Sequence, residues 1–161
     1  MTLTIDQIAT LRAHADTVPA MQTAIANSDD AAIRDYFNGL STEYGWRTNV
    51  QPNEYLLALD WTEVDSLTAG PARIWEWMTS LQSRPLNFSK SNVRAGLANA
   101  FSVAQAPDSR AGLLSIASRL MTIAEKVLSS GGSGTASDAR IMTFEGSITI
   151  QDASNIRAYG D

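Results

Sequence analysis

The chain has 161 residues, with 12 basic and 17 acidic side chains, one histidine and no cysteine. The absence of cysteine excludes disulfides, thiolate nucleophiles and cysteine-ligated zinc, and the formal charge of -5 argues against broad electrostatic capture of nucleic acid. A hydrophobic content of 44% with 18% charged residues is typical of one globular domain. No apolar run approaches the roughly 18 residues of a membrane-spanning helix, so no membrane partner is expected.

Helix signals dominate the N-terminal part of the sequence. A capping-box pattern predicts a helix over about residues 5–15, and Pro19 begins a short second helix. Ser28 or Asp29 caps a third helix, which stops at Gly39. The chain is therefore expected to begin with three short helices.

The middle of the chain is also predicted to be helical, after a loop over residues 41–51. Pro52 begins a short helix, and Asp60 caps a brief helical turn. Thr68 begins a Trp-rich helix, and Ser89 caps the helix that follows. These signals indicate a body built from helices.

Pro107 or Asp108 is predicted to begin the longest helix, which ends near residue 127. The apolar stripe of this helix would consist of Leu113, Ile116, Leu120, Ile123 and Val127. Residues 129–139 then form a flexible Ser/Gly connector, and residues 140–150 alternate apolar and polar side chains as a β-hairpin does. Asp152 caps a last short helix.

The fold class predicted from these patterns is mainly α. We expect a compact multi-helix domain over residues 1–128, a flexible connector over residues 129–139, and a β-hairpin with a short helix over residues 140–161. A lone hairpin is marginally stable in water and needs a further strand or a covering surface. The hairpin is expected either to add to a neighbouring molecule or to fold back onto its own helices.

The Trp-rich helix carries large side chains on more than one face. Neighbouring helical positions point in different directions, so Trp75 and Trp77 cannot share one narrow stripe. Such a helix is expected to be central in the fold or contacted from two sides, as in a subunit of a ring. The interface residues that we predict are Trp75, Trp77, Met78, Arg84, Lys90, Arg94, Ile141, Phe144, Ile148 and Ile150.

The residues that could support chemistry favour a structural interpretation, and no catalytic, cofactor or metal site is predicted. His14 has no serine or carboxylate arranged around it in the sequence. Asp60, Glu63 and Asp65 could line a Mg²⁺ or Ca²⁺ site, but Asp60 fits a helix cap better. The basic residues near position 90 could meet DNA phosphates or an acidic partner, although Arg94 is expected to form ion pairs that tie helices together.

A resemblance to a known family covers about residues 46–157. Its first part rests on Trp46-Arg47-Thr48, Val50, Leu59-Asp60-Trp61-Thr62, Val64-Asp65, Leu67, Ala72-Arg73-Ile74-Trp75-Glu76-Trp77-Met78, Asn87, Ser89-Lys90 and Asn92-Val93-Arg94-Ala95-Gly96. Its second part rests on Ala117-Ser118-Arg119, Glu125-Lys126, Phe144-Glu145-Gly146 and Asp152. In these residues the chain resembles an uncharacterised family of virion proteins of tailed bacteriophages and prophages, from the head–tail junction or tail region.

The resemblance implies a structural virion protein without enzymatic activity or cofactors. The expected function is a head–tail connector or adaptor subunit of the phage neck, forming a homo-oligomeric ring between portal and tail. Its partners would be further copies, the portal, and tail or neck proteins, with double-stranded DNA passing non-specifically through the ring. The expected location is the virion, and the host cytoplasm during assembly. The alternatives are a tail or capsid accessory protein, such as a minor or decoration subunit, and a non-virion assembly chaperone.

Overall fold

The computed structural model describes residues 3–80 and 85–160. Over these residues the protein is mainly α-helical, with ten helices and three short strands. The helices are α1 (Ile5–Ala15), α2 (Pro19–Ala26), α3 (Asp30–Asn38), α4 (Pro52–Leu57), α5 (Trp61–Ser66), α6 (Ala69–Ser80), α7 (Ser91–Ala100), α8 (Pro107–Ala117), α9 (Ile123–Val127) and α10 (Ile150–Ala158). The strands are β1 (Leu40–Trp46), β2 (Ser118–Thr122) and β3 (Arg140–Ile141).

The chain divides into two compact units. Unit 1 comprises Met1–Gly45, Leu120–Gly132 and Arg140–Asp161, and unit 2 comprises Trp46–Arg119 and Ser133–Ala139. The chain therefore leaves unit 1 twice and returns to it twice. This grouping differs from the predicted division at residues 128 and 139, because the C-terminal residues belong with the N-terminal helices.

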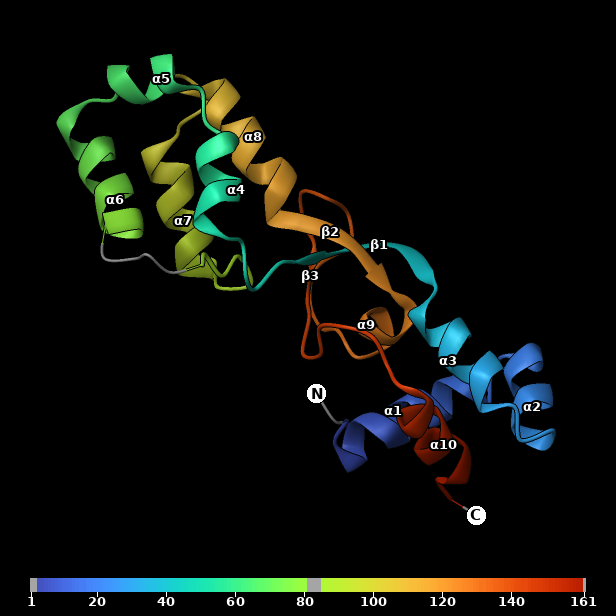
Figure 1. Ribbon diagram of the computed structural model, residues 1–161. Coiled ribbons are helices and arrows are strands. Elements are labelled where there is room, and N and C mark those ends of the chain that lie inside the picture. Colours follow the sequence, from blue (N-terminus) through green and yellow to red (C-terminus); the bar gives the residue numbers. More distant parts are fainter. Residues whose placement is uncertain (1–2, 81–84, 161) are drawn as a thin grey trace. The chain divides into compact units, whose positions relative to one another are not determined.

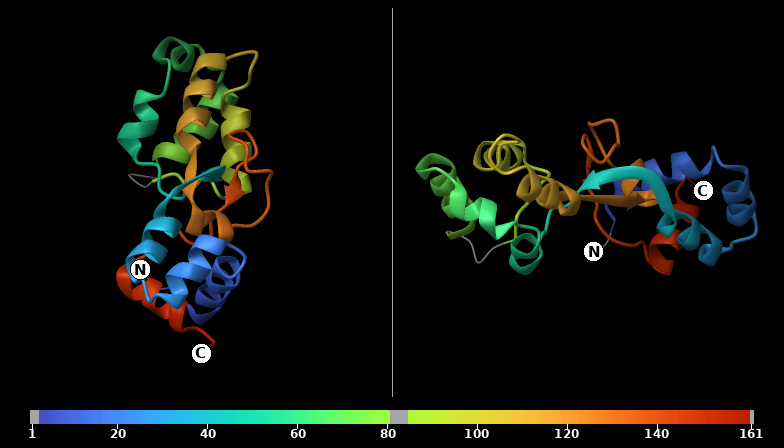
Figure 2. Two further views of the ribbon diagram at one scale, coloured as in Figure 1. Left: turned by 90° about the vertical axis from the view of Figure 1, so that its right-hand side faces the viewer. Right: turned by 90° about the horizontal axis from the view of Figure 1, so that it is seen from above.

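Unit 1 packs α1, α3 and α10 together, with α2 and α9 against them (Figures 1 and 2). Local caps define these helices: Thr4 and Gln7 form the capping box of α1, and Asp29 caps α3. The Arg12 guanidinium in α1 donates to the carbonyls of Arg157 and Tyr159 at the end of α10. Side chains from all five helices meet in one core, which includes Ile8, Leu11, Met21, Ile33, Phe37, Ala124, Ala153 and Ile156.

The two-stranded hairpin predicted over residues 140–150 is not confirmed. Strand β3 covers Arg140–Ile141, and residues 142–149 form no strand. These residues instead run into the unit 1 core, where Phe144 and Ile148 are buried. The side-chain amide of Asn38 holds Ile148 by accepting from its N–H at 2.8 Å and donating to its carbonyl at 3.0 Å. The C-terminal segment is therefore core, not an extended arm.

The strand that the C-terminal residues require comes from the same chain. The sheet order is β2-β1-β3, so β1 is the central strand. The other side of β3 is covered too, because the Ile141 backbone exchanges hydrogen bonds of 2.9 and 3.0 Å with Ser130. The prediction of a loop over residues 41–51 missed β1, and the prediction of one long helix to residue 127 missed β2.

Ionic contacts join three separate segments of unit 1. Glu43 in β1 accepts hydrogen bonds from Lys126 in α9, at 2.8 Å, and from Arg140 in β3. The hydrogen bond from Lys126 and the nearby charges lower the pKa of Glu43, although burial acts to raise it. At neutral pH this carboxylate is therefore ionised and shared between two cations.

The predicted Ser/Gly connector is also hydrogen-bonded. The Ser133 N–H donates to the Asp138 carboxylate at 2.8 Å, and the Ser118 hydroxyl donates to the Ala136 carbonyl at 3.2 Å. Gly131, with φ of 60°, adopts the left-handed conformation that glycine accommodates without strain. The flexible connector expected over residues 129–139 is not confirmed.

Unit 2 packs α6 against α7, and α8 against α4 and α5 (Figure 1). Helix α8 passes very close to the end of α4: a Cβ at Gly112 would lie 2.1 Å from the Ala58 carbonyl oxygen. Glycine is required there because any larger residue would meet backbone. In both units, none of the described helices is long and apolar enough to cross a bilayer.

Candidate interaction surface

Helix α6 places its first tryptophan inside unit 2. Trp75 is buried between two aromatic rings in edge-to-face contact, Tyr55 at 5.8 Å and Phe101 at 5.0 Å between ring centroids. Trp75 therefore belongs to the core of unit 2 and is not available to a partner. The side chain of Trp77 lies outside the described part of the chain.

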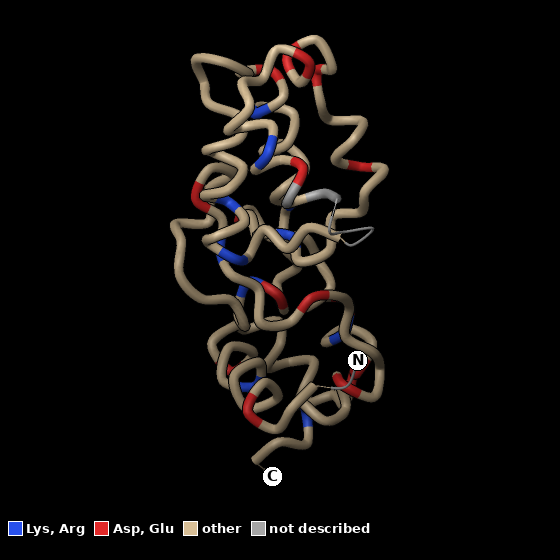
Figure 3. Tube along the Cα trace, turned by 90° about the vertical axis from the view of Figure 1, so that its left-hand side faces the viewer, with Lys and Arg blue, Asp and Glu red and all other residues tan. Residues whose placement is uncertain are grey.

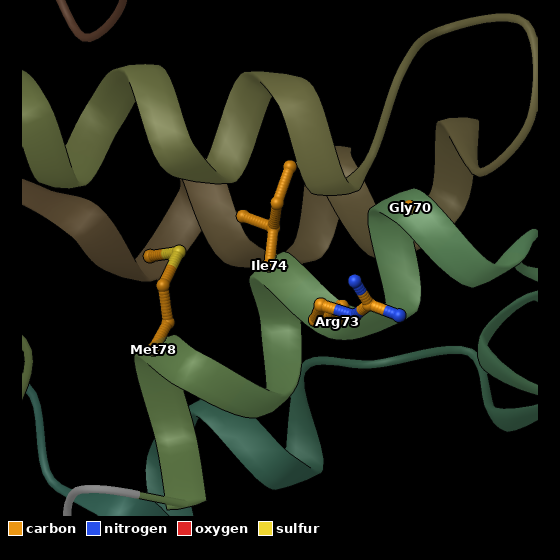
Figure 4. A pocket seen from close by; sticks show the side chains of 4 residues that line it. All are labelled: Gly70, Arg73, Ile74 and Met78. Carbon is orange, nitrogen blue, oxygen red and sulfur yellow. The ribbon is translucent and has the colours of Figure 1, made fainter.

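The open side of α6 carries a groove with a mostly apolar wall, lined by Gly70, Arg73, Ile74 and Met78 (Figure 4). In this view Ile74 and Met78 extend toward α7, whereas the Arg73 side chain points away from it. The Met78 sulfur lies so close to α7 that a Cβ at Gly96 would be 2.9 Å from it. Met78 is thus both a contact between the helices and a wall of the groove.

The predicted basic cluster is divided between internal and exposed positions. Arg94 donates to the carbonyls of Phe88, at 2.6 Å, and Ser89, at 2.8 Å, and its guanidinium lies 4.8 Å from the centroid of Trp46. This cation–π contact replaces the ion pair with a carboxylate that the sequence suggested. Lys90 is exposed at the start of α7, and Arg84 lies outside the described residues.

The predicted C-terminal interface residues also separate into two classes. Phe144 and Ile148 are buried in the unit 1 core, so they cannot serve as an interface without unfolding it. Ile141 and Ile150 are 40% and 43% exposed, which leaves both accessible to a partner. None of these four C-terminal residues lines the groove of α6.

Leu57 and Trp61 are among the exposed apolar residues of unit 2 that were not predicted as interface residues. Leu57, at the end of α4, is 86% exposed, and Trp61, at the start of α5, is 54% exposed. The brief helical turn predicted after Asp60 corresponds to α5, which contains no fully buried residue. Side-chain caps stabilise the ends of so short a helix.

Two of the three carboxylates at α5, Asp60 and Glu63, cap helices. Asp60 accepts from the N–H groups of Thr62 and Glu63 and caps α5 itself. Glu63 accepts from the N–H groups of Asp108, at 3.0 Å, and Ser109, at 2.7 Å, and so caps the start of α8 from 45 residues away. Burial acts to raise the pKa of Glu63, but these hydrogen bonds outweigh it and lower the pKa. Both carboxylates are thus engaged with backbone, rather than arranged around a cation.

The single histidine has a partner that the sequence did not suggest. His14 Nε2 lies 3.0 Å from the Tyr36 hydroxyl, and the two rings are stacked with centroids 6.1 Å apart. Burial, and then the charge of Lys126, lower the pKa of His14. His14 is therefore neutral at pH 7.

The charges are distributed unevenly between the units. Unit 1 contains five basic and ten acidic residues, whereas unit 2 contains seven of each, which together make the total of 12 and 17. Lys and Arg are interspersed with Asp and Glu along the trace (Figure 3). Neither unit has an excess of basic residues.

No protein-family model matches the chain, and neither a curated protein nor a solved structure matches it. The resemblance to phage virion proteins therefore stays a prediction from the residues quoted above.

Proposed function

We propose that the chain is a structural virion protein of a tailed bacteriophage, a head–tail connector subunit that forms a ring between portal and tail. In this role it binds copies of itself and neighbouring proteins of the particle, and it catalyses no reaction. The phage setting rests on the resemblance over residues 46–157.

The observation that carries the binding role is the open groove on α6. Apolar side chains that line an exposed hollow are typical of surfaces that another protein covers. Leu57 and Trp61 add exposed apolar area in the same unit. Charged groups of this unit, such as Glu63 and Arg94, are meanwhile engaged in internal contacts.

The balance of charge is compatible with DNA passing through such a ring. Unit 2 is neutral by formal charge and unit 1 has a net charge of -5. Duplex DNA binds tightly where lysine and arginine neutralise its phosphates. Without a basic excess, a subunit of this composition would let DNA slide past it.

The protein composition of purified particles tests the proposal. Mass spectrometry of particles from the phage or prophage that encodes the chain should detect it at a fixed number of copies per particle. A chain found in assembly intermediates and absent from finished particles would instead be an assembly factor. Absence from both would end the proposal.

Self-assembly of the purified protein tests the groove. We expect Ile74→Asp to reduce assembly, measured by light scattering after size exclusion and by negative-stain imaging. The matched control is Val103→Asp, at a position in unit 2 that is 71% exposed and outside the groove. Near-ultraviolet circular dichroism of the aromatic side chains checks that the variant stays folded. Wild-type protein that remains a 17.3 kDa monomer at all concentrations would contradict ring formation.

A further inference from the structure

Besides the groove of α6 in unit 2, the structure has a hollow in unit 1, which plays no part in the proposed function. The polar residues that line it include His14 from α1, Tyr36 from α3, Thr42 from β1 and Lys126 from α9, and the apolar residues include Leu40 and Val127. The volume is about 260 Å³. At about 30 Å³ per water molecule in the liquid, this space suits an organic molecule of roughly eight non-hydrogen atoms.

The hollow has an excess of positive charge. None of the described residues that line it is an acid. The nearest ionic contact is that of Glu43, which is shared between Lys126 and Arg140, so two cations accompany one carboxylate. Lys126 has three N–H donors and its side chain is 41% exposed, so donors remain for another acceptor.

The remaining polar groups are also suited to an anion. The Tyr36 hydroxyl lies 3.0 Å from His14 Nε2, and the Thr42 hydroxyl lines the same hollow. Hydroxyl and ammonium groups can all donate to a carboxylate oxygen. In the same hollow, Leu40 is 72% exposed and Val127 is half-buried, so an aliphatic chain could cover apolar area there.

We propose that this hollow binds a small monocarboxylate with a short aliphatic chain. The carboxylate contacts Lys126 and Tyr36, and the aliphatic part lies against Leu40 and Val127. The site is formed entirely within unit 1, so it does not depend on assembly.

The single histidine makes the test direct. In NMR spectra of the full chain, the imidazole Cε1–H signal belongs to His14, since no other histidine is present. Titration with hexanoate at constant ionic strength should move this signal to saturation. Acetate, which lacks the aliphatic chain, and hexanol, which lacks the charge, should each bind at least roughly tenfold more weakly than hexanoate. Hexylamine, with the opposite charge, should cause no saturable shift.

The two lysines of the chain provide a matched pair of variants. Lys126→Gln should weaken hexanoate binding by roughly tenfold, because a charged hydrogen bond is lost, whereas Lys90→Gln, in unit 2, should bind as the wild type does. Tyr36→Phe leaves the contact between Lys126 and Glu43 in place and should also weaken binding. The absence of a saturable shift with hexanoate, an equal response to hexylamine, or unchanged binding in both Lys126→Gln and Tyr36→Phe would overturn the proposal.

Discussion

At the scale of single residues, glycines let the helices of unit 2 approach their neighbours closely. Gly112 in α8 faces the Ala58 carbonyl, and Gly96 in α7 faces the Met78 sulfur. The two contacts differ in kind, because a thioether can rotate away and a backbone carbonyl cannot. The space around a glycine, rather than its helix propensity, therefore decides the effect of a substitution.

Gly112→Ala should destabilise unit 2 by about 1–3 kcal/mol or more, because the added methyl group meets the Ala58 carbonyl. Gly70→Ala is the matched control: it is also helical, and nothing lies within 4 Å of its Cβ position. That variant should be neutral or stabilised by up to about 1 kcal/mol. Urea unfolding followed by tryptophan fluorescence measures both, and equal midpoints would contradict the close approach.

Glu63 should make the stability of unit 2 depend on pH. The folded-state pKa of Glu63 is lowered, so its contribution is present above the ordinary value of 4.5 and is lost as the pH falls through the folded value. The difference in urea midpoint between wild type and Glu63→Gln should be largest at pH 7 and should narrow as the pH falls below 4.5. Asp65→Asn, an exposed position in the same helix, controls for the change in net charge. A gap that stays constant with pH would rule out the cap.

At the scale of elements, the sequence predicts the helices that carry their own caps. Thr4, Asp29 and Asp60 each begin a helix where the sequence places one. The strands were missed because β1 lacks clean alternation of buried and exposed residues. Strand β2 was missed because Leu113, Ile116, Leu120, Ile123 and Val127 keep helical spacing across α8, β2 and α9. The capping box of Thr122 and Glu125, which begins α9, was the available signal.

The binding features were harder to predict, because they depend on residues far apart in the chain. His14, Tyr36 and Lys126 come together only when α1, α3 and α9 pack. The groove residues of α6 share one helix, and Met78, one of the predicted interface residues, lines the groove. Exposure of Trp61 could not, since an indole is ordinarily expected to be buried.

Helix α10 should be essential for unit 1 because its buried face completes the core. Ile156→Ala should cost about 2–5 kcal/mol, whereas Ile150→Ala, 43% exposed in the same helix, should cost little. Hydrogen exchange of peptides from α1, α3 and α10 reports this difference. Unchanged protection in Ile156→Ala would restore the expectation that the C-terminal residues form a separate arm.

At the scale of the whole molecule, each unit has its own reporter. All four tryptophans, at positions 46, 61, 75 and 77, belong to unit 2, and the single histidine belongs to unit 1. Fluorescence therefore follows one unit and the His14 signal follows the other. Each unit is compact by itself, so a substitution can be directed at one unit at a time.

Ile156→Ala should lower the midpoint of unit 1 and leave the tryptophan transition unchanged. Gly112→Ala should lower the midpoint followed by tryptophan fluorescence and leave the midpoint followed by the His14 signal as in the wild type. Thermal unfolding followed by NMR and fluorescence on the same samples measures both. Parallel shifts of the two signals in either variant would mean that the units unfold as one.

The interleaved path of the chain has a consequence for the order of events on the ribosome. Unit 2 is complete once Ala139 has emerged, but unit 1 still lacks α10 at that moment. Domains usually fold in the order of synthesis. In this chain the three helices that are made first cannot complete their core until the last segment is made. Until then Leu11, Ile33 and Phe37 lack the core side chains that α10 contributes. Apolar surface that stays exposed during synthesis favours aggregation, so the first part of the chain to be made is also the part most exposed to this risk.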